Sequence, residues 1–244
     1  MGLVSKWWSK KRASAPLPLT PENLQIYVIH YSPFGDRRRH MEKQITDHGL
    51  DRFPVRWITE YDREAIAEAH RKAAYCDPEK FNASHVSLIL KHLECYRSIS
   101  NSPVPYHLIL EDDVFLISGF IDQLANILSE LPPDWKFFFV GCGCNLHIPP
   151  WQRRFGKRVY LRKPHAALFA GAGISRCTEA YLINPDFAPT FLSTRKANPP
   201  FTRSIDWLIN EAGEELKVCS HWAEPPLARQ GAFESWTKNP SLNQ

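Results

Sequence analysis

The 244-residue sequence lacks any apolar run long enough to cross a membrane. A membrane-spanning helix needs roughly 18 or more consecutive apolar residues. The longest apolar segments here, Leu108 to Leu110 and Phe137 to Val140, have the length of short buried strands. The first residues also lack the apolar segment of a secretory signal peptide. We therefore expect a cytoplasmic protein, with any membrane contact peripheral and at the inner membrane.

The chain has little excess charge outside its first dozen residues. Its 30 basic and 26 acidic side chains give a net charge of +4, and Lys6, Lys10, Lys11 and Arg12 account for that difference. A nucleic-acid-binding domain usually carries its positive excess on the folded body, so we expect no nucleic-acid partner. The six cysteines are scattered rather than spaced as a disulfide framework, which favours a reducing compartment.

Residues 1–22 have the composition of a flexible tail. Trp7-Trp8 stands beside the basic cluster, and a stretch rich in Pro, Ala and Ser follows. Each basic residue near an anionic lipid surface contributes roughly 1 kcal/mol of binding, so the tail is interpreted either as a disordered leader or as a peripheral membrane contact. We predict a tail over residues 1–22, one domain over residues 23–236 and a second tail over residues 237–244.

Apolar periodicity predicts an α/β domain that begins with a parallel β-α-β unit. A β-rich run over residues 25–31 precedes helical spacing over residues 37–47, with Asp36 as the N-cap and Gly49 as the stop. Val55-Arg56-Trp57-Ile58 then forms a second strand. Further strands are expected over residues 106–110 and 136–140, further helices over residues 62–74, 84–98, 120–131 and 206–215, and a more irregular C-terminal third.

Glu111-Asp112-Asp113 is the strongest candidate for chemistry. The three carboxylates follow the apolar run Leu108 to Leu110 and precede a second apolar run. Charges beside a core are costly unless they are compensated, and Mg²⁺ or Mn²⁺ favours carboxylate oxygens together with phosphate and water. In an extended segment Glu111 and Asp113 share one side, at the strand end where open α/β sheets bind ligands. The triplet predicts a metal site, with a solvated acidic turn as the alternative.

An ordered set of short motifs resembles glycosyltransferase family 25, which includes bacterial lipooligosaccharide galactosyltransferases and collagen galactosyltransferases. The resemblance extends from about Gln25 to Gln230. Its pieces are Tyr27-Val-Ile-His30 with Arg37-Arg38-Arg39 behind it, Leu88-Ile-Leu-Lys-His92, Leu110-Glu-Asp-Asp113, Ala180-Tyr-Leu-Ile183 with Asn184-Pro185, Ser204-Ile-Asp206-Trp207, and Pro225 to Gln230.

The resemblance implies a GT-A-like fold, a Rossmann-like mixed sheet with flanking helices in a single domain. It implies an inverting, metal-dependent transfer of galactose or a similar hexose from a UDP-sugar to a glycan hydroxyl, in lipopolysaccharide or other surface-glycan biosynthesis. The acceptor would be a glycan or a lipid-linked glycan, and the cofactor Mn²⁺ or Mg²⁺. Catalytic roles would fall to Asp206 and Asp112, although Asp206 equally suits the N-cap of the helix at Trp207.

The remaining site residues follow from their places along this pattern. We expect metal ligation by Glu111 and Asp113, with His221 as a third metal or phosphate contact from the C-terminal part, and a packed loop histidine as the alternative for His221. The residues expected to bind the donor are Ser32, Arg37, Glu60, Asp62, His92, Glu111 and Gln230.

One departure from the family pattern affects donor preference. The family typically has serine before the histidine, whereas this chain has Lys91 before His92.

Two other functions remain open at this point. One is a metal-dependent nucleotidyltransferase or phosphohydrolase that uses the same carboxylates. The other is a non-catalytic module that binds a nucleotide sugar.

Overall fold

A computed structural model of the chain describes residues 18–68, 83–164 and 173–231. Seven strands form one mixed sheet in the order β2-β1-β3-β7-β5-β8-β6. The strands of this sheet are β1 (Leu24–Ile29), β2 (Val55–Ile58), β3 (Tyr106–Glu111), β5 (Phe137–Phe139), β6 (Val159–Arg162), β7 (Ala180–Ile183) and β8 (Ser220–Ala223). The helices are α1 (Gly35–Asp47), α3 (Ala83–Ser100), α4 (Phe120–Leu128), α5 (Ala188–Ser193) and α6 (Ile205–Leu216).

Strand directions confirm the predicted β-α-β unit and show a mixed sheet. Strand β1 pairs in parallel with β2 and β3, and β5 pairs in parallel with β8. Strand β7 runs antiparallel between β3 and β5, and β6 runs antiparallel at the edge beside β8. The carboxyl ends of β1, β2, β3, β5 and β8 therefore lie along the same edge of the sheet, which we call the carboxyl edge.

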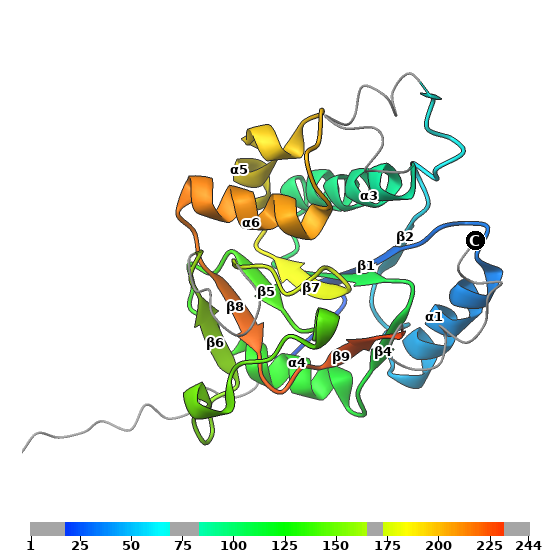
Figure 1. Cartoon of the computed structure of the whole chain (residues 1–244). Coiled ribbons are helices and arrows are strands. Elements are labelled where there is room, and N and C mark those ends of the chain that lie inside the picture. The colour runs from blue at the N-terminus through cyan, green and yellow to red at the C-terminus, as the bar shows by residue number, and fades with distance from the viewer. Residues whose placement is uncertain (1–17, 69–82, 165–172, 232–244) are drawn as a thin grey trace, which may run out of the picture.

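Helices cover both faces of the sheet because its strands are apolar on both sides. Along β1, Tyr27 and Ile29 contribute to one buried cluster, whereas Ile26 and Val28 contribute to the other. Figure 1 shows α3, α5 and α6 over one face and α1 and α4 over the opposite face. The result is a single α/β domain of three layers, with both cores extending along the whole sheet.

A second, two-stranded sheet lies beside the carboxyl edge. Strand β4 (Val114–Leu116) pairs antiparallel with β9 (Ala228–Gln230). Short 3-10 turns occur at Gly143–Asn145, Pro150–Gln152 and Arg195–Ala197. Because β4 begins just after the acidic triplet, β9 brings the C-terminal part of the chain to that triplet.

Three local expectations from sequence differ from the structure. Residues 62–67 are not helical, so the helix expected over residues 62–74 does not begin at residue 62, while residues 69–74 lie outside the described ones. Asp36 lies within the first turn of α1, and Phe34 occupies the N-cap position. Within residues 173–231, the described part of the C-terminal third, strands β7 to β9 and helices α5 and α6 form regular elements. Gly49 has φ +65° and ends α1 as expected.

Membrane-spanning helices are not found in the part of the chain that the structure describes. Of the predicted segments, residues 1–17 and 232–244 lie outside the described residues. The boundaries of the domain and of its two tails therefore stay predictions.

Candidate active site at the carboxyl edge of the sheet

The acidic triplet is held between the main sheet and the small sheet. Glu111 ends β3, and its N–H donates to the carbonyl oxygen of Glu179 (2.9 Å). The carbonyl oxygen of Asp113 accepts from the N–H of Gly231 (2.7 Å), just past β9. A Cβ atom on Gly231 would lie 2.8 Å from that oxygen, so this approach requires glycine. The backbone on both sides of the triplet is thereby fixed.

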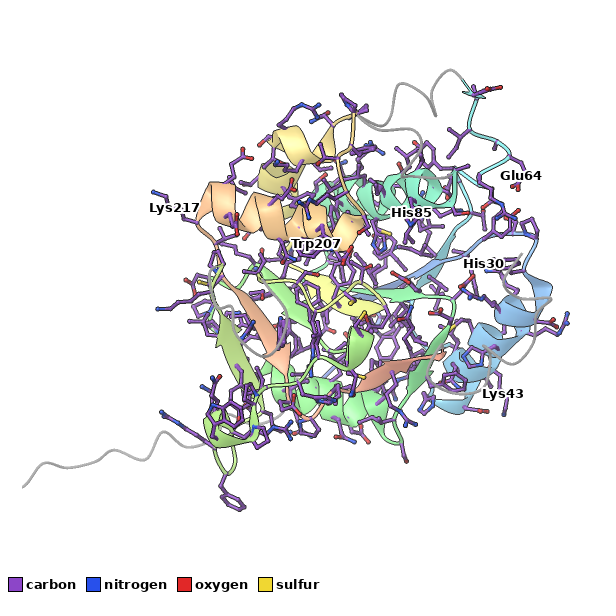
Figure 2. All side chains as sticks on the ribbon, in the orientation of Figure 1. His30, Lys43, Glu64, His85, Trp207 and Lys217 are labelled. Atoms are coloured by element: carbon purple, nitrogen blue, oxygen red, sulfur yellow. The ribbon has the colours of Figure 1, made fainter. Side chains whose placement is uncertain are left out.

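Asp112 is buried with two cationic or hydrogen-bonding partners. His30 Nδ1 lies 2.7 Å from Asp112 Oδ2, and Arg37 NH1 donates to Asp112 Oδ1 at 2.9 Å. Burial by itself would raise the pKa of Asp112, but the hydrogen bond from His30 and the charge of Arg37 outweigh it and hold the pKa below the usual value. Figure 2 labels His30 on this side of the molecule, near α1. Asp112 is therefore a fixed anion that orients Arg37.

Within the triplet, Asp113 is the carboxylate least compensated by the protein. Its Oδ2 lies 3.5 Å from Arg37 NH1, while its Oδ1 is buried with no hydrogen-bond partner among the described residues. Burial, together with repulsion from Glu111, raises the pKa of Asp113 to about 7, against the lowering effects of Arg37 and of a hydrogen bond with Gln230. An additional cation beside Glu111 and Asp113 would relieve both effects.

Glu111 connects the triplet to the face covered by α3. Its Oε1 accepts from Thr178 Oγ1 at 2.7 Å and lies 3.4 Å from His92 Nε2. His92 is fully buried in α3, with its Nδ1 2.8 Å from the hydroxyl of Tyr181 in β7. The predicted proximity of His92 and Glu111 is thus present, with His92 behind the carboxylate.

A pocket of about 300 Å³ opens beside Glu111 and Asp112. Its aromatic wall consists of Tyr31 and Phe34, whose rings meet edge to face with centroids 4.8 Å apart. The guanidinium groups of Arg37 and Arg63 lie 5.3 Å from the Phe34 ring and 4.5 Å from the Tyr31 ring. Two guanidinium groups with aromatic rings suit a ligand that combines a phosphate with a flat or apolar part.

Lys91 forms the buried base of this pocket. Its Nζ donates to the carbonyl oxygen of His30 (2.8 Å) and to Asp62 Oδ1 (2.7 Å). Asp62 Oδ2 also accepts from the N–H of Ser32 (3.2 Å). The structure thus brings together Ser32, Asp62 and the lysine that replaces the family's serine. Lys91 was missed as a site residue from sequence because its contacts join segments about 30 or more positions apart. The aromatic wall, Tyr31 and Phe34, was also missed.

Two predicted residues do not join the site. Glu60 is bound to Arg56 (2.9 Å) on the strand β2 side, and it does not line the pocket. His221 lies in β8, three strands from β3, which is about 14 Å at the usual strand spacing. Its register through Phe138 and Leu182 places it level with Leu108, well before the strand end. His221 is therefore not placed to share a metal ion with Glu111 and Asp113, contrary to our prediction.

Asp206 lies at the same edge, in the first turn of α6. Ser204 is the N-cap residue, and its hydroxyl donates to Asp206 Oδ1, so the N-cap alternative for Asp206 is wrong. Burial and the charges of Glu179 and Asp206 raise the pKa of the Cys177 thiol, which places both carboxylates near Cys177. Trp207, next to Asp206 in sequence, is labelled in Figure 2.

Glu179 is a buried carboxyl that sequence reasoning missed. Its Oε1 accepts from the N–H of Gly143 (2.5 Å), and a Cβ atom at Gly141 or Gly143 would overlap its side chain. Burial, with the charge of Glu111, raises the pKa of Glu179 to about 8. The glycines in Gly141-Cys142-Gly143 were the available sequence signal, since they make room for this side chain.

The donor set fits a hard divalent cation bound together with a ligand. Glu111 and Asp113 supply carboxylate oxygens, and one of these is a buried oxygen without a partner among the described residues. Within residues 18–68, 83–164 and 173–231, however, no three His, Cys, Asp or Glu side chains converge on one point. Mg²⁺ is commonly held by one or two carboxylates plus substrate phosphates and water. A metal here would take its remaining ligands from a phosphate-containing substrate and solvent.

Comparison with known proteins gives the family. A model of glycosyltransferase family 25, with the description LPS biosynthesis protein, matches residues 23–208. The chain belongs to glycosyltransferase family 25. Glycosyl transfer is therefore its class of reaction, and the family in general uses a nucleotide-sugar donor and a glycan acceptor.

Two of the solved structures found as similar to this chain are described as follows. One is a glycosyltransferase involved in the glycosylation of the major capsid of PBCV-1, with 10% identity and a TM-score of 0.44 over 88% of this chain and 96% of that chain. Another is mouse xyloside xylosyltransferase 1 in its apo form, with 11% identity and a TM-score of 0.37 over 82% and 72%. No curated protein matches the sequence. The family assignment rests on the family model.

Proposed function

We propose that this family 25 glycosyltransferase transfers a hexose, galactose or a similar sugar, from a UDP-sugar to a glycan hydroxyl with inversion of the anomeric carbon. The observation that carries the proposal is Asp113, a buried carboxylate with an unpartnered oxygen beside Glu111 and next to a pocket lined by arginines. Mn²⁺ or Mg²⁺, when bound there, would supply positive charge to the diphosphate leaving group. A GT-A-like arrangement of donor and acceptor sites goes with this proposal.

The protein's own groups have separate parts in the proposed reaction. Arg37, oriented by Asp112, faces the donor phosphates, and Tyr31 and Phe34 hold the apolar part of the donor. Asp206 removes the proton from the acceptor hydroxyl as that oxygen forms the new bond to the anomeric carbon. The bond from that carbon to the diphosphate breaks at the same time, and UDP leaves with the bonding electrons.

We propose surface glycan, lipopolysaccharide included, as the class of acceptor, on the basis of the family description. A lipid-linked acceptor would suit a protein that works from the cytoplasmic side of the inner membrane. Contact of the tail with that membrane stays a prediction, because residues 1–17 lie outside the described ones. Family membership favours glycosyl transfer over nucleotidyl transfer, phosphate hydrolysis or binding alone.

One experiment, with the Asp206→Asn variant and a panel of donors, tests both the assignment of Asp206 as the base and the identity of the donor. Wild type is assayed for UDP release and sugar transfer across a panel of nucleotide sugars, with Mn²⁺ and with chelator. We expect turnover with a UDP-hexose that needs the metal, and a fall in kcat of roughly 10²–10⁴-fold in Asp206→Asn with donor binding retained. Release of pyrophosphate or free phosphate in place of UDP, or an unchanged kcat in the variant, would contradict the proposal.

A further inference from the structure

The loop of residues 149–158 is the most exposed apolar feature of the described chain outside the pocket. We call it the basic-aromatic loop. Trp151 is 72% exposed and Phe155 fully exposed, whereas most large apolar side chains of the molecule are buried. Two largely exposed aromatic side chains within five positions form a candidate contact surface for another molecule.

The tip of this loop is a hydrogen-bonded turn. The N–H of Lys157 donates to the carbonyl oxygen of Arg154 (3.1 Å), and Gly156 has φ +73°, as the third position of a type II turn requires. The Tyr160 hydroxyl accepts from the N–H of Arg154 (2.9 Å) and donates to the carbonyl oxygen of Lys157 (3.1 Å). Phe155 is thus held outward by hydrogen bonds on both sides, so its exposure is imposed by the fold.

The charge around the two rings is of one sign. Residues 150–163 contain six basic side chains and no acidic one. Arg158 is paired with Glu130 (2.7 Å) and Arg153 with Glu224 (3.2 Å). Among the described residues no carboxylate forms an ion pair with Arg154 or Lys157, the two cations that flank Phe155 and Gly156. The tip therefore presents an aromatic ring between uncompensated positive charges.

The loop extends from the same edge of the sheet as the candidate active site. Strand β6 begins with Val159 beside Ala223, at the carboxyl end of β8. Figure 1 shows the 3-10 turn Pro150–Gln152 below β6, on the side of the sheet away from α3, α5 and α6. A flat body that meets the loop tip therefore lies toward the carboxyl edge, away from these three helices.

We propose that the basic-aromatic loop docks this protein on an anionic lipid bilayer, with Trp151 and Phe155 at the headgroup boundary and Arg154 and Lys157 on lipid phosphates. Aromatic side chains settle at the membrane interface, and basic residues add attraction to anionic headgroups. This surface consists of other residues than the N-terminal tail, and its role is independent of which sugar is transferred. It would bring a membrane-bound acceptor within reach of the carboxyl edge.

Vesicle co-sedimentation of the full chain tests the proposal, with phosphatidylcholine vesicles and with vesicles that also contain phosphatidylglycerol. Wild type should bind the anionic vesicles and lose that binding at high salt. Arg154→Glu/Lys157→Glu should weaken binding by roughly 25-fold or more, about fivefold for each positive charge lost. Trp151→Ser/Phe155→Ser should weaken it by roughly tenfold.

A matched control is Lys43→Glu/Lys217→Glu, which makes the same change of charge on other sides of the molecule, as the labels in Figure 2 show. This control should bind vesicles as wild type does. UDP release with a water-soluble acceptor should be unchanged in both loop variants, which separates docking from catalysis. Equal vesicle binding by wild type and both loop variants would overturn the proposal. So would binding to DNA or heparin without vesicle binding, or a dimer that Trp151→Ser/Phe155→Ser dissociates.

Discussion

Buried charges at the carboxyl edge are the main energetic feature at the scale of single residues. Lys91, Asp112 and Asp113 are each at most 6% exposed. A buried charge is tolerated only when it is paired and hydrogen-bonded. Lys91 and Asp112 meet that condition within the protein, whereas Asp113 meets it only in part, which is why we propose Asp113 as a metal ligand.

Lys91→Ser, which restores the residue typical of the family, should destabilise this protein. Serine is too short to replace the ammonium that holds Asp62 and the carbonyl oxygen of His30. We expect a loss of about 1–3 kcal/mol in the free energy of unfolding, measured by urea denaturation. Lys43→Ser, at an exposed lysine of α1, is the control and should change stability by under about 0.5 kcal/mol. Equal stability of Lys91→Ser and wild type would show that the ammonium contributes nothing.

His107 gives the protein a pH-dependent stability. Burial lowers the pKa of His107 to about 4, against a hydrogen bond to the carbonyl oxygen of Val104 that raises it. The unfolded chain then binds the proton more readily than the folded one. Stability is complete above about pH 6.5 and falls as the pH drops toward 4, by up to about 3 kcal/mol.

His107→Phe should remove this contribution. Its unfolding free energy, measured by urea titration between pH 4 and 7, should change less with pH than that of wild type. Parallel pH profiles for the two proteins would assign the acid sensitivity to other groups.

At the scale of elements, the β4–β9 pair determines where the triplet lies. Strand β9 comes from residues more than 110 positions after Asp113, and yet Gly231 and Gln230 contact it. The small sheet therefore fixes Asp113 from one side, and β3 fixes Glu111 from the other. A change in β9 should therefore affect the metal site before it affects the core.

Gly231→Ala should impair catalysis through the position of Asp113. The new Cβ would lie 2.8 Å from the carbonyl oxygen of Asp113, and backbone must shift to relieve that contact. We expect kcat to fall roughly tenfold or more, with a raised concentration of Mn²⁺ needed for half-maximal activity. A variant as active as wild type at every Mn²⁺ concentration would show that this contact does not position Asp113.

The helices and strands also show how much of the fold could be predicted from the sequence alone. Local apolar patterns predicted β1, β2, β3 and α3 well, because each buries a continuous face. The antiparallel insertion of β7 between β3 and β5 was not predictable, since strand order depends on tertiary pairing. The triplet and Asp206 were predicted as site residues from the sequence and stay predictions, whereas the places of Lys91, Tyr31 and Glu179 needed the fold. His221 was expected beside the triplet because neither the position of its strand in the sheet nor the register of that strand could be predicted from sequence.

At the scale of the whole molecule, one edge of the sheet brings together the polar and charged residues of the candidate active site. Segments around His30, Asp62, Lys91, Asp113 and Glu179 meet there, because parallel strands end on a common side. Family membership assigns glycosyl transfer to the chain, and we propose that the reaction takes place at the pocket and the triplet. The basic-aromatic loop extends from the same edge, so substrate binding and membrane contact would face one side.

Asp113→Asn tests the central claim most directly, since it keeps the size of the side chain and removes its charge. We would measure Mn²⁺-dependent UDP release from the UDP-sugar that wild type uses, and Mn²⁺ binding in the presence of UDP by calorimetry. The account predicts loss of metal-dependent turnover by at least about 10²-fold and weaker Mn²⁺ binding, in a protein that stays folded. Wild-type turnover and Mn²⁺ affinity in Asp113→Asn would contradict it.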